Sequence, residues 1–93
     1  MNPRMKQKID RAAAALKEFG AKEVYVFGSA AEGRFTRHSD IDMAVSGLPP
    51  KVFFAAMGEA MSVLGCSLDL IDLDDESTFT QYLKMNGKLQ RVI

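Results

Sequence analysis

The first third of the chain carries apolar residues at helical spacing. They recur every three or four positions from Met5 to Phe19, which places them on one face of a helix. Pro3 is suited to the first turn of such a helix, and Gly20 is suited to its end. The pattern therefore predicts a helix over about residues 3–19.

Two later segments show the same period. A second helix, which Pro49 or Pro50 can open, has its apolar stripe between Phe53 and Leu64 and ends at Gly65, as a helix with a glycine C-cap does. The next helix is predicted to follow the polar run 74–77, which is rich in helix-starting residues. Its apolar side comprises Phe79, Tyr82 and Leu83, joined by Leu89 if Asn86-Gly87 interrupts the helix rather than ending it. The tail, 88–93, is compatible with either a helix or a short strand.

Three shorter runs have the composition or the alternation of strands. Residues 23–27 are mainly β-branched and aromatic, and 40–46 and 67–73 alternate between two faces. The predicted order is helix, strand, loop, strand, helix, strand, helix. We therefore expect an α/β (α+β) domain with a small sheet of about three strands and helices covering one face. The pattern alone does not give the strand directions.

Length and charge narrow the class of protein. The 93 residues are enough for a single domain, 1–93, and 12 basic residues balance 12 acidic ones. This balance argues against direct nucleic-acid binding but not against a phosphate-bearing substrate, because a metal ion can supply positive charge locally. One cysteine, Cys66, cannot form an internal disulfide, and we expect it to fill space in the core. With no apolar run long enough for a membrane span, a cytoplasmic protein is expected.

Candidate chemistry begins with paired acids. Asp40 and Asp42 lie two positions apart in a predicted strand, so their side chains point to the same face. Adjacent carboxylates repel unless a cation lies between them, and carboxylate oxygens are ligands that Mg²⁺ prefers. Asp69 interrupts an apolar strand, and a buried carboxylate needs a partner. If its strand neighbours that of Asp42, Asp69 reaches the same metal cluster. Asp72, Asp74 and Asp75 are interpreted as structural residues at a strand end and a helix start.

A glycine turn closes the preceding strand. Gly28 lets the main chain turn sharply and approach a ligand, and Ser29 adds a hydroxyl and an amide that suit phosphate oxygens. Either feature alone is common. A Gly-Ser turn followed about a dozen residues later by Ser39 and the acid pair is much more specific.

The runs Gly-Ser-Ala-Ala-Glu-Gly (28–33) and Ser-Asp-Ile-Asp (39–42) resemble a motif of the polymerase-β-like nucleotidyltransferase superfamily. The short length resembles the minimal nucleotidyltransferases, antitoxin-type proteins often paired with a HEPN-domain toxin. The resemblance covers nearly the whole chain. That family also has a third acid between apolar residues on a later strand, which Asp69 matches.

The resemblance implies a site and a reaction. Asp40, Asp42 and Asp69 would be catalytic and would hold Mg²⁺, with two ions expected, and Asp69 would help to activate the acceptor hydroxyl. Gly28 and Ser29 would bind the β- and γ-phosphates of ATP, and Ser39 would contact the nucleotide or orient Asp40. The product would be an AMP-modified hydroxyl, in the antitoxin branch a tyrosine of a HEPN-type toxin.

The chain departs from the family between the two halves of the motif. Basic residues are frequent there in the family, where this chain has Ala30 and Glu32, and Glu32 does not favour a triphosphate. Arg34 and Arg37 either compensate or are solvated loop charges, and His38 is read as an exposed loop residue.

Two other interpretations are weighed. The chain could be a non-catalytic binding module that neutralises a partner protein by occlusion, or a small domain whose acids are merely solvated. The acceptor, the nucleotide preference and self-association are left open.

Overall fold

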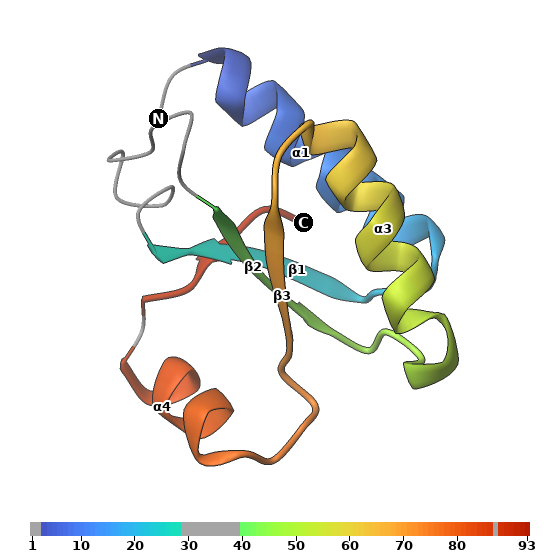
Figure 1. The fold of residues 1–93 in the computed structure, drawn as a ribbon. Helices are drawn as coiled ribbons and strands as arrows, with labels where there is room; N and C mark the ends of the chain where they lie inside the picture. Colours follow the sequence, from blue (N-terminus) through green and yellow to red (C-terminus); the bar gives the residue numbers. More distant parts are fainter. Residues whose placement is uncertain (1–2, 29–39, 87) are drawn as a thin grey trace.

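A mixed four-stranded sheet in the order β3-β2-β1-β4 lies at the centre of the molecule (Figure 1). The computed structural model describes residues 3–28, 40–86 and 88–93. The strands are β1 (Glu23–Phe27), β2 (Ile41–Ser46), β3 (Leu68–Asp72) and β4 (Gln90–Arg91). β1 pairs antiparallel with both β2 and β4, whereas β2 and β3 run parallel. The α+β class expected from the sequence is confirmed.

The helices lie close to the predicted ranges. They are α1 (Pro3–Glu18), α3 (Phe53–Leu64) and α4 (Thr78–Asn86), and a 3₁₀ turn, η1 (Pro50–Val52), precedes α3. Gly65 ends α3 with φ of 71°, and its N–H donates to the Met61 carbonyl at 2.9 Å. Ser77 precedes α4, and its Oγ accepts from the N–H of Thr80 at 3.2 Å, as an N-cap hydroxyl does.

One face of the sheet is covered by α1 and α3, which pack side by side (Figure 1). Ile9 and Leu16 of α1 are buried, and α3 buries Ala56, Ala60 and Leu64. Small alanine side chains at a contact between helices allow their backbones to approach closely. Leu68 and Leu70 of β3 belong to the same core, as their alternation predicts.

The other face has its own smaller apolar cluster. Phe27, Ala44 and Leu73 are buried there together with Leu83 of α4. Alternation explains it, because Val24 and Val26 of β1 belong to the first core while Tyr25 and Phe27 belong to the second. The sequence predicted that the helices cover one face of the sheet. α1 and α3 do so, but α4 packs on the opposite face.

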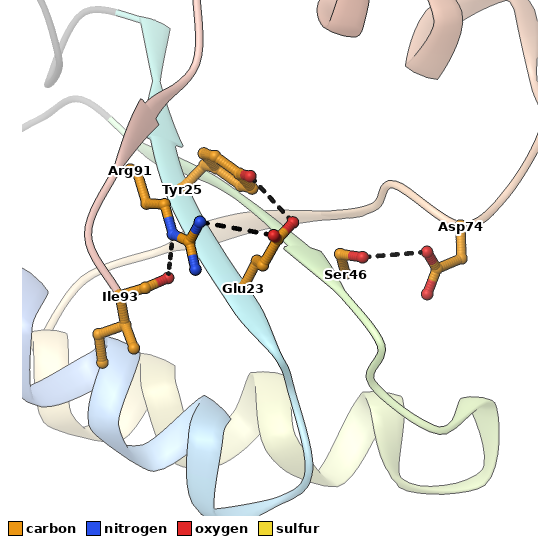
Figure 2. A network of polar contacts seen from close by, with 6 residues as sticks. All are labelled: Glu23, Tyr25, Ser46, Asp74, Arg91 and Ile93. Carbon is orange, nitrogen blue, oxygen red and sulfur yellow. Dashed lines mark hydrogen bonds and ion pairs between the residues drawn. The ribbon is translucent and has the colours of Figure 1, made fainter.

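The fourth strand comes from the tail whose structure the sequence left open. β4 pairs only with β1, through Tyr25 with Arg91 and Val26 with Gln90. Figure 2 shows how polar groups hold it: Arg91 Nη1 lies 3.5 Å from a carboxylate oxygen of Glu23, whose other oxygen accepts from the Tyr25 hydroxyl at 3.0 Å. A strand of two exposed polar residues is too short to show a periodic pattern in the sequence. It forms because the edge of β1 offers hydrogen-bonding groups to pair with.

The acidic run after β3 braces a turn. Asp74 accepts a hydrogen bond from the N–H of Gly47 at 2.6 Å and another from the hydroxyl of Ser46 at 3.2 Å (Figure 2). Its own N–H donates to Asp72 Oδ1 at 2.9 Å, and the N–H of Asp75 donates to the Asp72 carbonyl at 3.2 Å. These contacts agree with the structural role expected for the three aspartates. In the part of the chain that is described, no helix combines the length and the hydropathy that crossing a bilayer requires.

Candidate active site

Asp42 and Asp69 are register partners on the parallel strands β2 and β3. Neighbouring strands lie about 4.8 Å apart, and register partners point to the same face of a sheet. The alternation of both strands places this pair on the face that carries Ala44 and Ile71, opposite α1 and α3. The sheet therefore brings together two acids that are far apart in the sequence.

Among the described residues, the charges that act on Asp42 are negative. Its side chain is half-buried, and burial raises the pKa of Asp42, with the negative charges of Asp69 and Asp40 raising it further. Asp40 is exposed and stands immediately before β2. The ionised form of Asp42 is thus disfavoured here, and the attraction of a cation bound beside it would offset the cost of burial and the repulsion by the neighbouring acids.

Gly28 packs directly against the same carboxylate. It follows β1, whose last residue, Phe27, is the register partner of Asp42, and its φ is +74°. A Cβ at position 28 would overlap Asp42 Oδ2 and would lie 3.2 Å from Asp42 Cγ. Only glycine fits this close approach, so at the end of β1 it is the main chain of Gly28, without a side chain, that contacts Asp42. That arrangement suits the phosphate contact expected of Gly28.

The donor set fits a hard cation such as Mg²⁺. It consists of carboxylate oxygens, and Mg²⁺ is commonly bound by one or two carboxylates together with substrate phosphates and water. Within residues 3–28, 40–86 and 88–93, no three Asp, Glu, His or Cys side chains are already gathered tightly enough to hold a metal ion. A cation here would therefore take Asp42, Asp69 and further oxygens that arrive with the substrate.

The rest of the expected site lies outside the described residues. This holds for the two serines expected to contact the nucleotide, Ser29 and Ser39. It also holds for the residues at which the chain departs from the family pattern, Ala30, Glu32, Arg34, Arg37 and His38. Their expected roles stay predictions.

Cys66 lies just before β3 and is half-buried against the α1–α3 core. Burial raises the pKa of the Cys66 thiol, the Asp40 carboxylate raises it further, and the Lys8 ammonium lowers it. The thiol is therefore protonated at neutral pH, as a core-filling residue would be. The charge of Lys8, on α1, therefore acts near the start of β3. The helical pattern of the sequence did not predict this, because it does not show which strand a residue of the helix faces.

Comparison with known families gives a match over most of the chain. Residues 7–90 match the family described as "Polymerase beta, Nucleotidyltransferase". No protein in the comparison with curated sequences matches the chain.

Solved structures with the same fold include nucleotidyltransferase antitoxins. A toxin–antitoxin complex with AMP-PNP is 26% identical, with a TM-score of 0.74 over 95% of this chain and 72% of that one. A tri-AMPylated HEPN toxin with its MNT antitoxin from Shewanella oneidensis matches at 22% identity and a TM-score of 0.69, over 96% and 72% of the two chains. A protein described as a minimal nucleotidyltransferase matches at 20% and 0.70, over 94% and 92%.

Proposed function

The chain belongs to the polymerase β nucleotidyltransferase family, and from this premise we propose that it transfers AMP from ATP to a hydroxyl group of a partner protein. The observation that carries the proposal is the register of Asp42 and Asp69, which places two carboxylates on one face beside the glycine turn. The proposal takes residues 1–93 as a single nucleotidyltransferase domain.

Asp40, Asp42 and Asp69 are proposed to hold Mg²⁺, with two ions in the complete site. When bound, the metal supplies positive charge for the triphosphate and for the charge that develops as pyrophosphate leaves. The raised pKa of Asp42 supports this assignment, because the two neighbouring acids contribute to it and a cation would offset them. Gly28, with Ser29, is proposed to bind the β- and γ-phosphates, and Ser39 to contact the nucleotide or orient Asp40.

The reaction is a substitution at phosphorus. The acceptor oxygen attacks the α-phosphorus of ATP, a new phosphorus–oxygen bond forms, and the bond from the α-phosphorus to the bridging oxygen breaks. Pyrophosphate leaves with that electron pair. Asp69 is exposed on the edge strand β3, not buried as its apolar neighbours in the sequence suggested, because its side chain points away from the α1–α3 core. It is within reach of solvent and is proposed to accept the hydroxyl proton.

A tyrosine of a HEPN-domain toxin is the proposed acceptor, which makes the chain an antitoxin. The complex with AMP-PNP and the complex with a tri-AMPylated HEPN toxin support this choice of nucleotide and partner class. We place the reaction in the cytoplasm, where ATP is available and where an unpaired thiol such as Cys66 is stable.

Labelling with radioactive ATP tests the proposal. The purified chain, Mg²⁺ and a HEPN-domain protein are mixed with ATP that is labelled either at the α- or at the γ-phosphate. We expect the partner to acquire label from α-labelled ATP only, because γ-label leaves in pyrophosphate. Asp42→Asn and Asp69→Asn should lower labelling at least about a hundredfold, whereas Asp10→Asn, on the exposed side of α1, should not. Label from γ-labelled ATP, or full activity of Asp42→Asn, would contradict the assignment.

Neutralisation by occlusion is the second candidate function. The exposed aromatic side chains Phe54 and Phe79 favour a protein-binding surface whatever the chemistry of the acids. Cell survival in the presence of the toxin separates the two functions. If the double variant Asp40→Asn/Asp42→Asn protects cells as well as the unchanged chain does, binding suffices; loss of protection by a folded double variant supports catalysis.

A further inference from the structure

A groove of about 640 Å³ lies between the start of α3, strand β3 and the start of α4. Its apolar lining includes Phe53, Phe54, Ile71 and Phe79. None of these side chains is fully buried. The groove is thus an open, partly aromatic surface on the outer edge of the sheet.

The aromatic side chains in this groove are unusually exposed. Phe54 is 76% exposed and Phe79 is 49% exposed. The Phe53 and Phe54 rings meet edge to face, with centroids 5.6 Å apart and an interplanar angle of 88°. The Phe54 ring makes this contact while most of its surface stays in water. Aromatic side chains are enriched among the anchors of protein interfaces.

The same groove is acidic. Its lining includes Asp72, Asp74 and Asp75, and none of the described residues that line it is basic. Their hydrogen bonds come from neutral groups, and none of the three forms an ion pair with a described residue. A partner segment that covers the aromatic rings therefore meets negative charge that no ion pair with a described residue neutralises.

The groove shares strand β3 with Asp69 of the acid pair. β3 is an edge strand of the sheet, so one side of it is free of strand neighbours. Ile71, in the groove, shares the sheet face of Asp69 and stands two residues from it, about 6.6 Å along the strand. A protein segment seated in the groove could therefore present a nearby hydroxyl to Asp69.

We infer that this groove docks the acceptor protein, through a segment whose apolar or aromatic anchor is flanked by Lys or Arg. Identifying the bound protein as the acceptor rests on the proposed function. Binding of the segment in the groove does not, because it needs neither nucleotide nor metal. The anchor covers Phe54 and Phe79, and the flanking cations pair with the aspartates. Charge complementarity favours such a segment over an acidic one.

Peptide selection tests the inference without knowledge of the acceptor. A displayed library of random 12-residue peptides is selected on the immobilised full chain, without ATP or Mg²⁺, and in parallel on the double variant Phe54→Ser/Phe79→Ser. Enriched peptides are then measured by fluorescence anisotropy. We expect them to combine an apolar anchor with Lys or Arg flanks, and to bind the double variant and Asp75→Lys at least about tenfold more weakly.

Two matched controls keep the test specific. Met85→Ser removes an apolar side chain that is 85% exposed but does not line the groove, and Glu59→Lys reverses an exposed charge of α3 outside it. Both should bind the selected peptides as the unchanged chain does. Circular dichroism confirms that each variant is folded.

Several outcomes would overturn the inference: no peptide that depends on the groove, enrichment of acidic flanks, or equal loss of binding in the controls. Enrichment of sequences matching the chain itself, with dimers in sedimentation, would identify a second copy as the occupant and overturn it too. Asp42→Asn should bind the peptides normally. Normal peptide binding without AMP transfer would refute the proposed function alone, and AMP transfer without groove-dependent binding would refute this inference alone.

Discussion

Asp42 on β2 lies directly opposite Asp69 on the parallel strand β3, and the Cα of each is the register partner of the other. Two like charges in this position destabilise a sheet unless a cation or a proton intervenes. The expected effects of Mg²⁺ and of pH on stability follow from this relationship.

The acid pair predicts that Mg²⁺ stabilises the folded chain. With free Mg²⁺ about tenfold above its dissociation constant, the gain in free energy of unfolding should be about 1.4 kcal/mol, a rise of several degrees in Tm. Asp42→Asn and Asp69→Asn should lose most of this gain, because each removes a carboxylate ligand. Scanning calorimetry with and without Mg²⁺ measures it. Asp10→Asn serves as the control, and an equal Mg²⁺ effect in all variants would exclude a site at the acid pair.

The raised pKa of Asp42 predicts a pH dependence in the absence of divalent ions. Between the pKa of the unfolded chain and the raised pKa of the folded chain, the folded state binds the proton more strongly. Stability from this group is therefore present at acid pH and is lost as pH rises through the raised pKa. Asp42→Asn removes the loss, so its free energy of unfolding relative to the unchanged chain should rise as pH increases from the pKa of the unfolded chain through the raised pKa of Asp42, and should level off above it. Urea unfolding in EDTA measures the difference, and no divergence between the two chains would contradict it.

Gly28→Ala is expected to damage the fold and the site together. The φ of +74° costs a residue with a Cβ about 1–2 kcal/mol, and the new methyl group overlaps the Asp42 carboxylate. The variant should lose at least this much stability and should bind Mg²⁺ more weakly. Gly58→Ala is the matched control, because position 58 is inside α3 and a Cβ there meets nothing within 4 Å. It should gain about 0.5–1 kcal/mol in urea unfolding, so equal effects of the two variants would refute the argument.

Leu83 is expected to anchor α4 to the sheet. Its side chain is 5% exposed in the cluster with Phe27, Ala44 and Leu73. Leu83→Ala should lower the free energy of unfolding by about 2–5 kcal/mol, a large share of the stability of a small domain. Met85→Ala, two residues further along α4 and 85% exposed, should change it by less than about 0.5 kcal/mol. Denaturant unfolding measures both, and a small effect of Leu83→Ala would mean that α4 packs only loosely.

The boundaries of the longer elements could be predicted because they depend on local signals. The strand over residues 23–27 and the end of α3 before Gly65 agree with the structure, since periodicity and a glycine cap act over a few neighbouring residues. β4 could not be predicted, because two exposed polar residues become a strand only when β1 offers a free edge. The position of Leu83 on the second face of the sheet could not be predicted for a related reason. The face that a helix covers depends on strands that are distant in the sequence.

Gly28, Asp40, Asp42 and Asp69 could be selected as site candidates from their residue types and spacing. The acidic groove beside Phe54 and Phe79 could not, because its lining comes from α3, β3 and α4 together. The sequence shows apolar positions on two separate helices. It does not show that these positions line one surface, or that three aspartates lie beside that surface.

The sequence by itself determined the three α-helices, the first three strands, the residue types of the acid pair and the need for glycine at a turn. The tertiary structure alone decided that β2 and β3 run parallel with Asp42 beside Asp69, and that Gly28 packs against Asp42. The physical reason is that alternation specifies which face a side chain occupies, but register and strand direction follow from packing the whole sheet against its helices.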